Sequence, residues 1–74
     1  MQRFFLHFRD GQEVIEDPDG YDFPNLAAAR EEAAASIRDV VVQLIQSGRA
    51  IGDPHLEIWD DTQKLVATIR LPLR

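Results

Sequence analysis

Two histidines are the residues of this 74-residue chain with the widest chemical repertoire. His7 and His55 each stand on the polar side of a segment in which apolar and polar residues alternate, with Glu13 and Glu57 as nearby carboxylates. Two imidazoles and a carboxylate can bind zinc or transfer protons. Strong zinc signatures have short paired spacings, which these histidines lack. We interpret both as solvated strand residues, and we keep small-ligand or metal binding near His7 as a third functional hypothesis.

Carboxylates and serines offer little further chemistry. The acidic segment 17–22 resembles calcium loops, but it lacks their closing bidentate glutamate, and Pro18 followed by Gly20 is typical of a type I turn. Ser36 and Ser47 lie inside or at the end of a predicted helix, without a glycine-flanked elbow or a local base. We therefore predict a protein that is not an enzyme, with no catalytic residue, no cofactor and no metal site.

Arg30 is a candidate anion-binding or structural arginine. It falls near the start of the predicted helix, close to its apolar face, between Leu26 and Ala33. Its methylene groups can pack along the edge of the core while the guanidinium reaches water or a strand carboxylate. We favour this structural interpretation, and anion binding is the alternative.

The segment 25–47 must position the other elements, because it alone is long and regular enough to present a continuous apolar face. Helical periodicity places the following residues on one side: Leu26, Ala29, Ala33, Ile37, Val40, Val41 and Leu44. Asn25 is the predicted N-cap, and Gly48 can adopt the left-handed conformation that ends a helix. A start with Pro24 at the first helical position is the alternative.

Alternating residues predict four strands, at 3–9, 13–16, 55–60 and 65–71, with Pro72 ending the last. Residues 1–74 are therefore expected to form one α+β domain of order ββαββ, in which a long helix packs on one face of a four-stranded, mostly antiparallel sheet. The strand order and both hairpin registers stay open. A two-residue first turn sets Leu6 opposite Ile15 and a three-residue turn sets it opposite Val14, so either residue can face the core.

One helix cannot cover both faces of such a sheet. If Phe4, Leu6 and Phe8 face the helix, the uncovered face is a candidate interaction face with these residues: Phe5, His7, Arg9 and Trp59. We predict an interaction or accessory module that forms a homodimer through this face or a strand edge and also binds a protein partner that the sequence does not identify. A stripe of small residues on the helix, at Ala28, Ala35 and Val42, is a weaker candidate for the dimer contact.

The alternative function is a nucleic-acid-associated regulator, because single-strand RNA binders stack bases on aromatic sheet faces. The net charge of -5 and the lack of a basic groove disfavour it. The chain has no cysteine, which excludes disulfides and thiolate metal sites and fits a reducing compartment. Basic residues interrupt the apolar N-terminal stretch, and no apolar run approaches membrane-spanning length, so we expect a cytoplasmic protein without a membrane partner.

Two motifs resemble a family of short bacterial proteins of unknown function. They are the aromatic run with His and Arg-Asp-Gly at 3–11, and Pro-Asn-Leu-Ala-Ala-Ala-Arg at 24–30, before an Asp-Asp turn at 60–61. The resemblance covers nearly the whole chain and implies no activity, since that family has no assigned site residues. Family members often have glycine where this chain has Gln63, and a side chain there enters the left-handed region at a higher cost. The form of that turn stays open.

Overall fold

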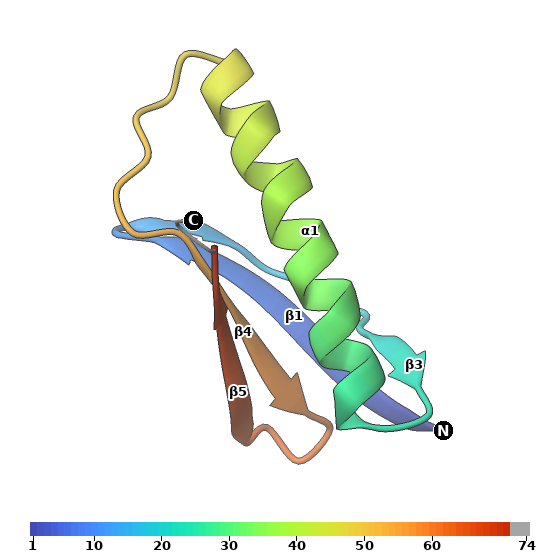
Figure 1. Ribbon diagram of the computed structural model, residues 1–74. Helices are drawn as coiled ribbons and strands as arrows, with labels where there is room; N and C mark the ends of the chain where they lie inside the picture. Colours follow the sequence, from blue (N-terminus) through green and yellow to red (C-terminus); the bar gives the residue numbers. More distant parts are fainter. Residues whose placement is uncertain (72–74) are drawn as a thin grey trace.

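The computed structural model describes residues 1–71. The elements follow one another as β1 (Gln2–Asp10), β2 (Glu13–Ile15), β3 (Tyr21–Phe23), α1 (Leu26–Gln46), β4 (His55–Asp60) and β5 (Leu65–Arg70). The strands form one antiparallel sheet in the order β2-β1-β4-β5, with β3 also paired to β1. The helix α1 crosses one face of this sheet (Figure 1). The predicted α+β fold, with one helix on an antiparallel sheet, is confirmed.

The edge of the sheet beside β1 is made of two short strands. β2 pairs with the C-terminal part of β1, where Phe8 lies opposite Ile15, and β3 pairs with the N-terminal part, where Phe4 lies opposite Tyr21. The segment 16–20 leaves the edge between them. The sequence prediction had no strand at β3, because three residues are too few for alternation to be recognised.

The first hairpin turns at Gly11 and Gln12, with Asp10 opposite Glu13. Gly11 has a φ of +63°, which a glycine adopts at low cost. Both registers considered from the sequence placed a β2 residue opposite Leu6, and both were wrong because the turn lies one or two residues later. As a result Ile15 shares the helix-facing side of Phe8, and Val14 shares the side of Arg9.

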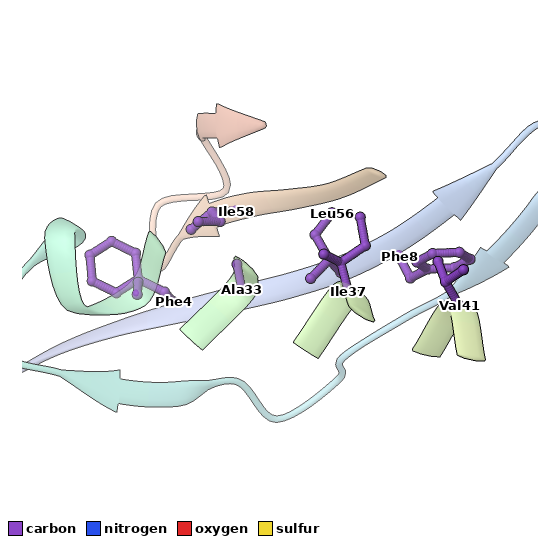
Figure 2. Packing of buried hydrophobic residues seen from close by; sticks show 8 residues of the cluster. Phe4, Phe8, Ala33, Ile37, Val41, Leu56 and Ile58 are labelled. Carbon is purple, nitrogen blue, oxygen red and sulfur yellow. The ribbon is translucent and has the colours of Figure 1, made fainter. Parts of the chain in front are cut away.

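The core lies between α1 and the central strands. Its buried members are Phe4, Phe8, Ala29, Ala33, Ile37, Val41, Leu56 and Ile58. Figure 2 shows Phe8 and Val41 toward one end of this cluster and Phe4 toward the other. Every residue predicted for the apolar side of the helix is in the core or packs against it. The full burial of one side chain such as Ile37 stabilises the folded chain by about 2 kcal/mol.

Both helix ends form as the sequence predicts. The Asn25 side chain accepts a hydrogen bond from the Ala28 amide at 2.9 Å and caps the first turn. At the other end Gly48 has a φ of +83°, and the Arg49 amide donates to the Leu44 carbonyl at 3.0 Å. This pattern is a Schellman motif, which satisfies carbonyls that have no partner within the helix. No helix within residues 1–71 has the length and apolar character needed to cross a membrane.

The turn between β4 and β5 is organised by Asp60. Hydrogen bonds from the Thr62 hydroxyl and from the Lys64 amide hold the pKa of the Asp60 carboxyl below its ordinary value. Gln63 adopts the left-handed conformation at a φ of +65°. A bulge at Val66 follows, so that Trp59 pairs with Leu65 while Ile58 pairs with Ala67. The predicted strand end at Pro72 lies outside the described residues.

Candidate interaction face

The sheet face turned away from α1 is the candidate site, and we call it the outer face. β1 and β4 pair so that Phe5 is opposite Trp59, His7 is opposite Glu57, and Arg9 is opposite His55. Side chains alternate along a strand, and the residues between these belong to the core or pack against it. β5 continues the same face with Leu65, Thr68 and Arg70.

The outer face consists of three rows that run across the strands. The apolar row contains Phe5, Trp59 and Leu65; the middle row contains His7, Glu57 and Thr68; the basic row contains Arg9, His55 and Arg70. Neighbouring rows are two residues apart along β1 and β4, which corresponds to about 7 Å, and the bulge at Val66 adds one residue between the apolar and middle rows on β5. The apolar and basic groups therefore lie at opposite ends of the face.

Three rings form a continuous aromatic surface on this face. The Phe5 and His7 rings are 6.4 Å apart and inclined by only 24°, and the His7 and Trp59 rings are also 6.4 Å apart. Gly20 lies against Phe5, since a Cβ added there would be 2.9 Å from the Phe5 ring. The rings line a shallow groove of about 360 Å³, to which Arg9 and the segment 16–18 contribute the other wall.

Glu57 is the electrostatic centre of the outer face. Its Oε1 accepts hydrogen bonds from Arg9 Nε at 2.8 Å and from Trp59 Nε1 at 3.1 Å, and its Oε2 is 3.8 Å from His55 Nε2. Partial burial acts to raise the pKa of Glu57, but the hydrogen bonds from Arg9 and Trp59 and the Arg9 charge outweigh it, and the pKa is lowered. The carboxylate is thus ionised and paired within the face.

His7 is held by a different contact. Its Nδ1 accepts a hydrogen bond from the Asp17 amide at 3.0 Å. His55 Nδ1 lies 3.2 Å from the Asp53 carbonyl oxygen, so the two histidines contact different parts of the chain. Within residues 1–71 no group of three histidine, cysteine, aspartate or glutamate side chains converges as a metal site.

Within the acidic segment 17–22, the side chain of Asp17 closes a turn. Asp17 Oδ1 accepts from the Gly20 amide at 3.1 Å, and Asp17 Oδ2 accepts from the Leu6 amide at 3.3 Å. Asp22 instead pairs with Arg3, so the carboxylates of the segment point to different partners. Glycine at position 20 has a φ of +72°, as the turn requires.

The remaining candidates do not join the outer face. Arg30 is exposed on α1 and, among the described residues, makes no hydrogen bond or ion pair. The Ser36 hydroxyl donates to Glu32, and the Ser47 hydroxyl donates to the Gln43 carbonyl, so both serines act within the helix. Arg30 therefore reaches none of the strand carboxylates proposed as its partners.

Sequence reasoning missed four residues that shape the face. Leu65, Thr68 and Arg70 follow from alternation in β5 once the bulge at Val66 is known, but a bulge has no clear sequence signal. Asp17 carries only a turn signal, and its contact with Leu6 depends on the path of the segment 16–20.

The fold and the outer face define a small α+β domain with one helix-covered and one uncovered sheet face. The chain matches the family described as a domain of unknown function (DUF6894) over residues 3–72, and it belongs to that family. Comparisons with curated proteins and with solved structures give no match. Because the family has no described function, the function must be argued from the geometry of the face.

Proposed function

We propose that this protein is a non-catalytic interaction module that forms a homodimer by stacking the outer faces of two copies. One observation carries the proposal. The two titratable groups of the middle row already have partners within the chain: Glu57 is bonded to Arg9 and Trp59, and His7 to Asp17. The aromatic surface can therefore be buried in a dimer without leaving an unpaired charge. An unpaired buried charge is the main energetic cost when a surface of apolar and charged groups becomes an interface.

The arrangement of rows favours a second copy as the occupant. Consider a two-fold axis that lies between two stacked sheets and runs across the strands at the level of the middle row. It sets the apolar row of one copy over the basic row of the other, and the reverse. Arg9 of one copy then lies over Phe5 of the other, where a guanidinium can stack on an aromatic ring, while His55 lies over Trp59 and Arg70 over Leu65. The face is complementary to itself in this orientation.

The electrostatics of the outer face disfavour catalysis and nucleic-acid binding. A general base works best when its pKa is near the working pH, whereas the pKa of Glu57 is lowered and its oxygens are engaged. Arg9 is the basic residue nearest the rings, and its charge is neutralised by Glu57, so it has little to offer a phosphate backbone. Since the chain lacks cysteine, the proposal places the dimer in the reducing cytoplasm.

Sedimentation equilibrium over a concentration series tests the proposal. The mass is expected to rise from that of an 8.4 kDa chain toward twice that value. Trp59→Ala should raise the dimer dissociation constant about thirtyfold, as expected for a central aromatic residue. Val42→Ala, on the exposed side of α1, is the control and should leave it unchanged. A mass independent of concentration, or dissociation by Val42→Ala instead, overturns the proposal. Binding of a labelled single-stranded oligonucleotide that competes with dimer formation favours the nucleic-acid alternative.

A further inference from the structure

A second surface lies on the helix side of the sheet, between α1 and the interrupted edge formed by β2 and β3. We call it the edge groove. It has a volume of about 450 Å³, within the range of binding sites. Leu6 and Ile15 form its sheet wall, Tyr21 and Phe23 its β3 wall, and Val40 its helix wall. In Figure 1, β3 and β5 lie on opposite sides of α1, and the groove is on the β3 side.

The edge groove exists because the segment 16–20 leaves the sheet edge. A continuous strand would place side chains beside Leu6, under α1, and would complete the core there. Instead the Asp17 side chain supplies the hydrogen-bond acceptor for the Leu6 amide, and the space next to it stays open. Ile15 is 47% exposed and Tyr21 is 61% exposed. Apolar side chains gathered in one groove, instead of scattered singly, are typical of an interaction site.

The charge of the edge groove specifies its occupant. Four acidic residues line it, Glu16, Asp17, Asp22 and Glu32, and no lysine, arginine or histidine within residues 1–71 does. The Asp22 carboxylate is paired with Arg3 and the Asp17 carboxylate accepts from two backbone amides, so Glu16 and Glu32 are the acidic groups left for a ligand. Glu16 follows directly after β2 and Glu32 lies on the helix wall, and neither has a basic partner among the described residues. A ligand with positive charges on either side of an apolar centre would satisfy both walls.

We propose that the edge groove binds a peptide segment of another protein in which apolar side chains are flanked by lysine or arginine. The apolar side chains pack against Ile15, Tyr21 and Val40, while the basic groups pair with Glu16 and Glu32. The segment 16–18 lines both this groove and the groove of the outer face, but the apolar contacts Ile15, Tyr21 and Val40 line the edge groove and not the outer one. A homodimer would therefore present two such grooves.

The probe is a fluorescein-labelled synthetic peptide of repeating leucine and lysine, compared with a peptide in which glutamate replaces every lysine. We expect fluorescence anisotropy to show binding of the lysine peptide only. Ile15→Arg should weaken this binding at least tenfold. Val14→Arg is the matched control, since it adds the same charge at a residue that is 42% exposed and lies on the other side of β2. It should leave the affinity within about twofold of the wild type.

Two more measurements separate groove binding from general attraction to an acidic protein. The double variant Glu16→Gln with Glu32→Gln should weaken binding about tenfold and reduce its dependence on salt. NMR methyl shifts on titration should centre on Ile15 and Val40 and leave the Trp59 indole unmoved. The proposal is overturned by no binding of the lysine peptide, by equal losses in Ile15→Arg and Val14→Arg, or by shifts centred on Trp59. None of these outcomes depends on the dimer.

Discussion

The carboxylate of Asp17 accepts a hydrogen bond from the backbone amide of Leu6 at 3.3 Å. Leu6 lies in the part of β1 between the residues that pair with β2 and those that pair with β3. The same carboxylate accepts a hydrogen bond from the Gly20 amide, and the Asp17 amide donates one to His7 Nδ1. One residue thus ties the segment 16–20 to β1 through two contacts, with the Leu6 amide and the His7 side chain. Asp17 also lines both grooves, so this contact shapes the outer face and the edge groove together.

Replacing Asp17 by alanine is expected to lower the free energy of unfolding by about 2 kcal/mol, because two backbone amides lose their acceptor in a partly buried position. Urea denaturation of the purified variant measures this. Asp19→Ala is the matched control, since the Asp19 side chain is exposed and only its carbonyl oxygen receives a hydrogen bond, from Arg3. Its effect should stay within about 0.5 kcal/mol. Equal losses in the two variants would show that the Asp17 carboxylate is not the anchor.

Gln63→Gly should stabilise the protein by about 1 kcal/mol. Gln63 holds a φ of +65°, a conformation that costs a residue with a Cβ more than it costs glycine. The readout is the midpoint of urea or thermal unfolding. Gln12→Gly serves as the control, because Gln12 is also in a hairpin turn but does not have a positive φ, and glycine there should be neutral or slightly destabilising. Destabilisation by Gln63→Gly would contradict the described form of this turn.

Glu57→Gln should lower the stability by about 1 kcal/mol at pH 7, because the ionised carboxylate accepts hydrogen bonds from Arg9 and Trp59. The folded-state pKa of Glu57 lies below its ordinary value of 4.5. Its contribution is therefore fully present above pH 4.5 and is lost as the pH falls through the folded-state pKa. Unfolding curves from pH 7 to pH 3 should show the difference between wild type and variant shrinking below this value.

Glu31→Gln, on the exposed side of α1, is the reference for that series and should change the stability at pH 7 by less than about 0.5 kcal/mol. A wild-type advantage over Glu57→Gln that grows as the pH falls would have the wrong sign for a carboxylate with a lowered pKa, and the pairing of Glu57 with Arg9 would have to be abandoned.

The helix and the core could be predicted from the sequence because independent signals agree. Apolar periodicity marks the buried side of α1, Asn25 marks its start and Gly48 its end, and each depends only on residues near in the chain. Alternation of apolar and polar residues likewise placed Phe5 and Trp59 on strands, on the sheet face turned away from the helix. The strand order was left open by the sequence, and the pairing of β1 with β4 sets these two residues directly opposite each other.

The details of both proposed surfaces could not be predicted, because they depend on contacts between distant parts of the chain. Arg9 and Glu57 are 48 residues apart, and they meet only through the register of β1 against β4. The edge groove depends on a side chain, that of Asp17, taking the place of strand hydrogen bonds. Turn residues at 17–20 indicate a reversal of the chain, but they do not indicate that the sheet edge resumes at β3.

Self-association through the outer face is tested most directly by NMR on a mixture of isotope-labelled and unlabelled chains, which reports only contacts between copies. We expect intermolecular nuclear Overhauser effects from the Phe5 ring of one copy to the side-chain methylenes of Arg9 of the other, and from the Trp59 ring of one copy to the His55 ring of the other. The absence of any intermolecular contact from the outer face at high protein concentration, or contacts from Ala28, Ala35 and Val42 on α1 in their place, would contradict the account.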